Sequence, residues 1–279
     1  MPPENNTYQL PTNTSADIRK MYIWLAVVFG GLIALGIAVI IFAQTLVKYV
    51  PFSAEERFIK PYEGSLVRPA MQGSEEGQVL QSYLEDLVDK LQSADSLSEE
   101  VTFKIHYSDK SVKNAYATLG GHMVVYRGLM NSVDSENGLA MIIAHEMAHI
   151  DNRDPAASMG RSLALSMIIA SQTGGYSEDI TDVLSQSGIN QFSRKQERQA
   201  DLLALDLLHT HYGHVGGRDE FFEKMKDNDV DLPAWLSSHP DMDARIAYLE
   251  KQSADKGYLV GETIPFPQSV REALNTSLF

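Results

Sequence analysis

The stretch His145-Glu146-Met147-Ala148-His149 decides how the rest of this chain is interpreted. On a helix, His145 and His149 lie one turn apart and project from the same face. Two imidazoles placed in this way can bind one Zn²⁺, and Glu146 lies about 100° further round the helix. That offset makes Glu146 a poor third ligand but places it within reach of a metal-bound water. The five residues therefore predict a metallohydrolase that carries its own general base.

The segments around this motif predict a small sheet beside a set of helices. Alternating apolar residues at 101–105 are typical of a strand, and further extended pieces are expected at 114–118 and 122–126. Asp134 or Ser135 can cap the helix that carries the two histidines. Apolar residues at helical spacing predict more helices, at about 74–92, at about 193–209 and after Pro240. The predicted fold class is α+β, mainly α.

Composition excludes several classes of protein. The 279 residues are 44% hydrophobic and 22% charged, which is typical of a globular protein. The net charge of -14 disfavours nucleic acid as a partner. Because there is no cysteine, disulfides, thiolate metal ligands, a cysteine nucleophile and a lipoprotein anchor are excluded. Any zinc must be held by histidine and carboxylate groups.

An uncharged run at 22–43 predicts a membrane-spanning helix. Its 22 residues are long enough to cross the ~30 Å hydrocarbon layer. A buried core helix would rarely run this long without a polar face, and a cleaved signal peptide would have a shorter apolar run and an A-x-A site. We therefore expect an uncleaved signal anchor that contacts the lipid bilayer. It would follow a polar tail at 1–21 and precede a linker or loosely packed collar at 44–75.

The basic residues near this run indicate its orientation. Arg19 and Lys20 abut its N-terminal end, which favours a cytoplasmic N-terminus and a catalytic domain on the periplasmic side of the inner membrane. Lys48, Arg57 and Lys60 follow the other end, so a plain count of positive charges does not decide the orientation.

Three later segments are less specific. The apolar residues at 161–170 are too few to span a bilayer and are expected to form a core or cleft-lining helix, with a second membrane dip at 161–172 as the alternative. Residues 174–188 are expected to form a loop with a short helix, and 258–279 a C-terminal tail. His209, His211 and His214 invite a second metal site, but residues two apart on a helix face different directions, so the pattern is weak.

A catalytic zinc needs a third protein ligand, and the expected helix after Ser193 offers one. Glu197 and Asp201 are four residues apart and share a face of that helix. Glu197 can bind zinc, while Asp201 can accept a hydrogen bond from the outer ring nitrogen of a ligand histidine. Without further support, such a pair is more often a solvated helix face.

The order of several motifs resembles one family of zinc peptidases. This is the family of HtpX, BepA, the mitochondrial OMA protease and the CAAX prenyl endopeptidase, that is, metallopeptidase family forty-eight, a gluzincin group. The matching stretches lie between about 110 and 250: Asn114-Ala115-Tyr116-Ala117 with Gly120-Gly121, Arg127-Gly128-Leu129, His145-Glu146-x-x-His149, Ser193-Arg194-x-x-Glu197-x-x-Ala200-Asp201, and Ser238-His239-Pro240 with Arg245-Ile246.

The resemblance implies a fold and a role for each matching residue. It implies a zincin-like catalytic domain at 76–257 and one Zn²⁺ per chain. His145, His149 and Glu197 would be the metal ligands, Glu146 the catalytic base, and Asp201 the partner of a ligand. His239 would be a catalytic donor to the oxyanion, and Arg245 would bind substrate or brace the site, unless it forms a surface ion pair with Asp241 or Asp243. The substrate would lie along Asn114, Ala115, Tyr116, Ala117 and Gly121.

Departures from the family pattern concern substrate fit more than metal binding. Arg153-Asp154 stands where the family often has R-H, and His122 stands where it usually has a bulky apolar residue. The glycine-containing A-G-Y turn that often follows the glutamate helix is replaced here by 209–214. We expect a single-span member without the helical repeats of BepA-like proteins.

Together these features predict a membrane-anchored zinc endopeptidase. Its substrates would be unfolded, membrane or envelope proteins, in a quality-control role. One alternative is a self-restrained chaperone or assembly factor that uses the same cleft for binding, with His239 in the fourth zinc position. A structural zinc domain is a weaker alternative, because it gives Glu146 no role. The sequence does not indicate an oligomeric state.

Overall fold

The computed structural model describes residues 15–66, 74–93, 97–173, 192–226, 234–239 and 241–276. The expected loop at 174–188 and most of the N-terminal tail lie outside these residues. The elements, in chain order, are α1 (Ser15–Val47), α2 (Phe52–Ile59), η1 (Lys60–Tyr62), α3 (Glu63–Leu66), α4 (Glu75–Gln92), β1 (Lys104–Ser108), β2 (Ala115–Ala117), η3 (Leu119–Gly121), β3 (His122–Tyr126), α5 (Arg127–Met130), α6 (Glu136–Asp151), α7 (Asp154–Thr173), α9 (Arg194–Tyr212), α10 (Glu220–Lys226), α11 (Ala234–Ser238), α12 (Met242–Asp255) and α13 (Gln268–Asn275).

The strands form a mixed three-stranded sheet in the order β1-β3-β2. β1 pairs with β3 in parallel, β2 pairs with β3 antiparallel, and β2 lies at one edge of the sheet. The prediction of a mainly helical α+β fold is confirmed. The first strand begins at Lys104 and not at Val101, although Val101 and Phe103 are buried as their alternation predicts.

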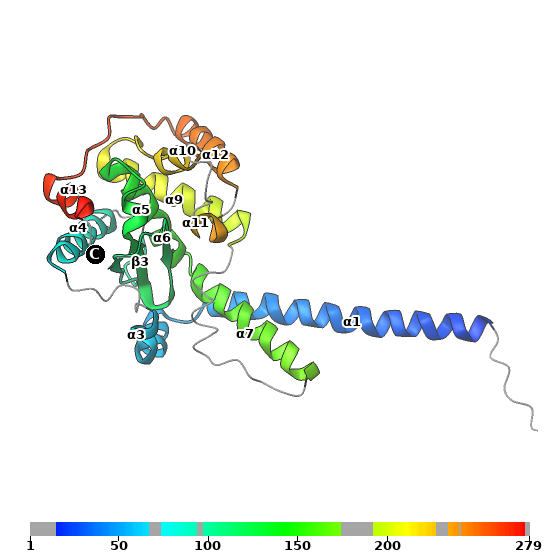
Figure 1. Ribbon diagram of the computed structural model, residues 1–279. Coiled ribbons are helices and arrows are strands. Elements are labelled where there is room, and N and C mark those ends of the chain that lie inside the picture. The colour runs from blue at the N-terminus through cyan, green and yellow to red at the C-terminus, as the bar shows by residue number, and fades with distance from the viewer. Residues whose placement is uncertain are drawn as a thin grey trace, which may run out of the picture.

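The helix that carries the two histidines lies at the centre of the domain (Figure 1). Ser135 caps α6, as expected, by accepting a hydrogen bond from the Gly138 amide at 3.0 Å. α6 is buried from Glu136 to Ile150, because α9, α4 and the sheet pack around it. The histidine face of α6 is therefore covered and does not look into an open cleft.

α1 extends away from this body as a single long helix (Figure 1). Within the part of the chain that the structure describes, it is the one helix that is long and apolar enough to cross a membrane, from Ile18 to Val47. None of its most apolar window is buried inside the protein. A soluble protein would not leave such a surface in water, so the structure supports a membrane anchor.

The expectation of a core or cleft-lining helix at 161–170 is wrong. These residues belong to α7, which leaves the body on the same side as α1 and packs against it (Figure 1). Leu165 and Met167 are 47% and 67% exposed. A short apolar stretch has the same sequence pattern whether it packs in a protein core or on the outside of a domain. The sequence alone therefore could not distinguish a core helix at 161–170 from the exposed one.

Two segments expected as linker and tail are packed onto the domain. Between α1 and α4, Phe52 and Ile59 are buried, and α2 lies against η3. At the other end, α13 packs against α4 through Val270, Ala273 and Leu274. The helix after Pro240 is therefore not the last one, and the tail interpretation of 258–279 is wrong through residue 276, since apolar residues at i, i+3 and i+4 form a short buried face.

Candidate active site

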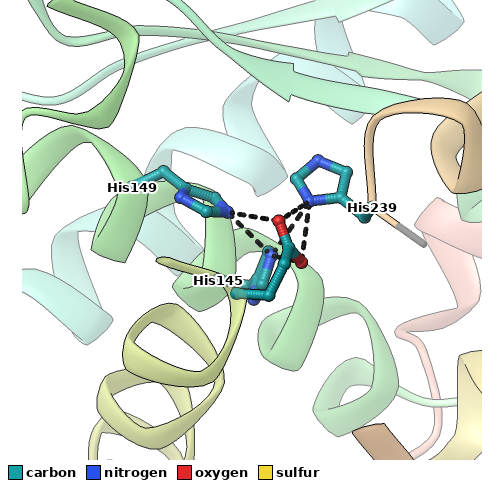
Figure 2. Close-up of side chains that lie close together, drawn as sticks. His145, His149 and His239 are labelled. Carbon is teal, nitrogen blue, oxygen red and sulfur yellow. Dashed lines mark hydrogen bonds and ion pairs between the residues drawn. The ribbon is translucent and has the colours of Figure 1, made fainter. Parts of the chain in front are cut away.

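Four side chains from three parts of the chain bring their ligand atoms within 4.8 Å of one another: His145, His149, Glu197 and His239. The three imidazole rings converge from different directions (Figure 2). His145 Nε2 lies 3.0 Å from His149 Nε2 and 3.4 Å from Glu197 Oε2. Helix α6 supplies the two adjacent histidines, and α9 supplies Glu197.

The donor set fits a tetrahedral metal ion. With ligand bonds of 2.0–2.1 Å, neighbouring donors of such an ion are about 3.3 Å apart. The separations here are 3.0 Å between the two motif histidines, 3.5 Å from His149 to Glu197, and 3.2 Å from His145 Nε2 to His239 Nδ1. These four residues are each no more than 4% exposed, and such a buried cluster of nitrogen and carboxylate donors could hold a metal ion.

Each motif histidine has a carboxylate behind it that fixes its ring. His145 Nδ1 lies 3.1 Å from Asp201 Oδ1, and His149 Nδ1 lies 2.9 Å from Asp154 Oδ2. Both contacts direct the Nε2 atoms toward the centre of the cluster. The role predicted for Asp201 fits this geometry. Asp154 was missed as a partner, although its position five residues after His149, at the first residue of the next helix, was a usable signal.

Arg245 on α12 holds the carboxylates together. It is buried, and it donates from Nε to Asp201 at 2.9 Å and approaches Glu197 Oε2 with Nη1 at 3.0 Å. The guanidinium lies over the Trp235 ring at 4.7 Å. The alternative of a surface ion pair is wrong: Asp241 pairs with Arg194 and Asp243 with Lys226. These contacts support the bracing role.

Glu146 lies behind the cluster and next to the edge strand. Its Oε2 accepts a hydrogen bond from the Ala117 amide at 2.8 Å, and its Oε1 accepts one from Trp235 Nε1 at 3.1 Å. Trp235 also stacks on His239, with ring centroids 4.4 Å apart. No sequence motif pointed to Trp235, or to Phe192, whose ring stacks on that of His149 with centroids 4.0 Å apart.

Neighbouring histidines and hydrogen bonds oppose the effect of burial on the two key carboxylates. Burial by itself raises the pKa of Glu146, but His239, His145 and His149 and the Trp235 hydrogen bond together lower it below its usual value. Burial also raises the pKa of Glu197, but His239 and the two motif histidines lower it more. The net result is a pKa well below the usual range. Both pKa shifts therefore favour the anionic form of these carboxylates.

The structure places the substrate-binding candidates at the β2 edge. Asn114 O accepts from Tyr126 N, and Thr118 N donates to His122 O, so even-numbered residues pair with β3. Because backbone groups alternate in direction along a strand, those of Ala115 and Ala117 face away from β3, although both residues are buried. Tyr116 is half-buried, with its ring 6.2 Å from that of Tyr126.

Gly121 has a structural role. Its φ is +78°, and a Cβ there would lie 1.9 Å from the carbonyl oxygen of Thr102. The contact is with the segment before β1, on the far side of the sheet from β2. The residue is therefore required by the turn rather than by contact with a substrate.

The histidines at 209–214 do not gather into a ligand set within the described residues. His209 stacks on Tyr258 with ring centroids 3.8 Å apart, and His214 Nδ1 accepts from the Gly216 amide at 3.0 Å. His211 packs edge-on against Tyr212. These contacts hold the end of α9 and the following loop.

Comparison with known proteins agrees with this geometry. The family model described as "Peptidase family M48" matches residues 75–253, which is more than half of the chain. The chain belongs to peptidase family M48. The match begins at α4 and includes the sheet, α6, α9, α11 with the following His239, and most of α12, so it contains all four donors of the site. The predicted family is confirmed.

Curated relatives are similar over different shares of their length. The mitochondrial metalloendopeptidase OMA1 of Schizosaccharomyces pombe is 28% identical over 252 residues, covering 83% of this chain and 72% of the relative. Human OMA1 is 27% identical over 54% of this chain, and the beta-barrel assembly-enhancing protease of Yersinia pestis is 25% identical over 61%. This M48 chain spans only 32% and 38% of those two relatives.

These findings establish the class of the protein. The family, the named relatives and the buried donor cluster identify a metalloendopeptidase, as predicted. The single apolar helix α1, together with relatives of this kind, indicates a membrane-anchored protein.

Proposed function

We propose that this M48 protein is a zinc endopeptidase in which His145, His149 and Glu197 hold the ion and Glu146 is the general base. The observation that carries the proposal is the position of Glu146 between the metal donors and the β2 edge. Its carboxylate lies 2.8 Å from the Ala117 amide and 3.5 Å from His239 Nε2. When bound, zinc lowers the pKa of a water ligand and polarises the carbonyl of the bond to be cut.

Side chains of the protein orient the general base and transfer the proton of the attacking water. Glu146 is anionic, so it can take a proton from the attacking water and deliver it to the leaving amine. Trp235 and Ala117 donate to the two carboxylate oxygens and fix their directions. His239, 1% exposed and within the cluster, is placed to donate to the oxyanion once a substrate is bound.

The outer edge of β2 is the proposed substrate site. Ala115 and Ala117 direct their backbone groups away from β3, but both residues are buried and the Ala117 amide already donates to Glu146. An extended peptide can therefore add there as a further strand once the residues that cover this edge move aside. Pairing through the backbone tolerates many side chains, which suits an enzyme that degrades unfolded proteins. A peptide on this edge would lie beside Glu146, whose carboxylate contacts the Ala117 amide.

We also propose that α1 spans the cytoplasmic (inner) membrane, with the N-terminus in the cytoplasm and the catalytic domain outside it. Arg19 and Lys20 at the start of the helix support this orientation, since basic residues are retained on the cytoplasmic side. Substrates would then be membrane or envelope proteins. A relative named as a beta-barrel assembly-enhancing protease is consistent with a role in envelope quality control.

Glu146→Gln tests the mechanism. The amide keeps the size of the side chain and can still accept the Trp235 hydrogen bond, but it cannot take a proton. We expect zinc content equal to wild type and a loss of casein cleavage of about 10²-fold or more. Zinc is measured by mass spectrometry on the same purified full-length sample. A variant that cuts at the wild-type rate would exclude Glu146 as the base.

A second candidate function is favoured by the closure of the site. His239 Nδ1 lies 3.0 Å from Glu197 Oε1 and 3.2 Å from His145 Nε2, where a fourth metal ligand would be. α11 lies beside the segment that leads into β2, with the Trp235 amide donating to Lys113 O at 3.3 Å. A catalytic zinc keeps one position open, whereas a site with four protein ligands is closed. The protein would then rest in a restrained state and act as a binding or assembly factor until α11 moves.

His239→Ala separates the two functions. A restrained enzyme gains casein cleavage when the fourth donor is removed, whereas an enzyme that uses His239 for the oxyanion loses activity by about 10²–10³-fold. Ser237→Ala changes an exposed side chain of the same helix α11, so it serves as the matched control for disturbance of that helix. Zinc content confirms that each variant retains the other ligands.

A further inference from the structure

The outer part of α7 has no charged residue between Ser162 and Thr173. These twelve residues form about 18 Å of helix. Leu165 and Met167 are 47% and 67% exposed, so apolar side chains lie on the surface of a helix that projects from the body. Exposed apolar residues on a projecting helix need a partner that is itself apolar.

α7 packs against α1 along a continuous stripe. On α1 the less exposed positions are Gly36, Ile40, Ala43, Gln44 and Val47, which recur at helical spacing among exposed neighbours. On α7 the stripe is Gly160, Ala164 and Ile168, each four residues apart.

Two contacts fix the direction and closeness of this pair. If Gly36 carried a Cβ, that atom would lie 3.8 Å from Cδ1 of Ile168. A Cβ on Gly160 would lie 2.9 Å from Cγ2 of Val47 and 3.2 Å from the Ala43 carbonyl oxygen. The two helices therefore run antiparallel. Small residues that bring two backbones together are typical of helix pairs in membranes, where tight packing replaces the hydrophobic effect.

The contact of Ile168 with α1 shows how deep α7 would reach into the membrane. Gly36 lies seven residues inside the uncharged run that ends at Ala43, which is about 10 Å of helix. Ile168 is level with Gly36 and therefore lies about 10 Å along α1 from that end. A span that reaches this depth from one surface enters the hydrocarbon layer without crossing its ~30 Å.

Charged residues gather at the other end of the pair, where a membrane surface would be. Lys48 follows α1 and lies 3.9 Å from Asp154, the first residue of α7. Arg153 pairs with Glu55 at 2.7 Å and donates to Val50 O. Arg161, one residue after the tight contact at Gly160, donates to Ser158 at 3.1 Å. The boundary between charged and uncharged residues thus falls at the same level on both helices.

We propose that α7 enters the membrane beside α1 and makes its outer face a lipid-contacting surface. The proposal rests on the assignment of α1 as a membrane span. α6 and α7 are separated only by Asn152 and Arg153, and Asp154 hydrogen-bonds the ligand His149. The metal cluster is therefore held close to the membrane surface, where it can reach segments of a substrate as they leave the bilayer.

The cysteine-free chain allows a direct test by spin labelling of the full-length protein. Single cysteines are placed at Leu165 and Met167, with Leu32 on α1 and Val260 on the domain surface as controls. Each labelled variant is reconstituted in phosphatidylcholine–phosphatidylglycerol vesicles opened to both sides. Relaxation by oxygen, which concentrates in lipid, is compared with relaxation by a neutral nickel chelate, which stays in water.

The expected result is a low oxygen-to-nickel ratio at 260, a high ratio at 32, and a ratio at 165 and 167 that is well above that at 260 but below that at 32, since these two positions lie nearer the membrane surface. A low ratio at 165 and 167 with a high ratio at 32 would overturn the insertion of α7 and leave the anchor intact. A low ratio at 32 as well would overturn the anchor itself. Low accessibility to both reagents at 165 and 167 would mean that protein covers α7, and it would also overturn the proposal.

Discussion

Replacement of Asp154 by alanine should weaken metal binding without removing a metal ligand. Asp154 Oδ2 accepts from His149 Nδ1 at 2.9 Å, and its Oδ1 accepts from Gln196 Nε2 at 2.7 Å. The side chain of Asp154 is 1% exposed, so no bulk water can take its place behind the histidine. His149 then loses the partner that fixes both its ring orientation and its tautomer.

The expected loss follows from this geometry. Removing a partner behind a metal-binding histidine costs 10- to 100-fold in affinity, or about 1.4–2.7 kcal/mol. Leaving the buried His149 N–H unpaired should also lower the free energy of unfolding of the metal-free protein by about 1–3 kcal/mol. Asp154→Asn keeps an acceptor at the same place and loses only the charge, so its affinity should fall between wild type and Asp154→Ala.

Zinc affinity can be measured by competition with a fluorescent chelator on the full-length protein in detergent. Asp151→Ala is the matched control, since Asp151 ends α6 and accepts from the Ser98 amide without touching the donors. Its zinc affinity should equal that of wild type. If Asp154→Ala also bound zinc as tightly as wild type while folded, the orienting role of Asp154 would be refuted.

Two further outcomes concern stability. Gly121→Ala should lower the free energy of unfolding by more than about 2 kcal/mol, and with it the thermal midpoint, because φ is +78° and the added Cβ would lie 1.9 Å from Thr102 O. Gly30→Ala, with nothing near its Cβ position, should leave the midpoint unchanged. His106→Asn should make stability less dependent on pH: burial and the neighbouring His122 lower the pKa of His106 to about 4. As the pH falls from 6.5 toward 4, His106 binds a proton in the unfolded chain but not in the folded one. The free energy of unfolding of wild type should therefore fall by about 1–3 kcal/mol more than that of the variant. Equal losses in the two proteins between pH 7.5 and 4.5 would contradict this.

The parts of the site that follow a helical period could be predicted from the sequence. His145 and His149, and then Glu197 and Asp201, are each four residues apart on one helix, so spacing alone places them together. Asp154, Trp235 and Phe192 come from helix starts or from segments outside the motifs, and only the tertiary fold brings them to the cluster.

The sequence predicted the fold well for elements with a regular pattern of buried residues. It predicted the fold poorly for elements whose structure depends on what covers their apolar face. α6, α4 and β3 bury regular patterns and were placed correctly. α7 has an apolar pattern that fits a protein core or a lipid layer equally, and α13 is too short for its three buried residues to stand out. An apolar pattern predicts that a helix face will be removed from water, but it does not identify the partner that covers the face.

The place of His239 has a consequence for how such a protein responds to ligands. An imidazole that occupies the fourth donor position is a tethered competitor whose local concentration does not change on dilution. The apparent affinity of any active-site ligand is then reduced by the fraction of molecules in which α11 has moved away. A hundredfold gain in inhibitor binding on removal of His239 would correspond to an open fraction of about 1%, or about 2.7 kcal/mol. In the proposed restrained state, inhibitor potency would therefore measure the closed-to-open equilibrium even when no peptide bond is cut.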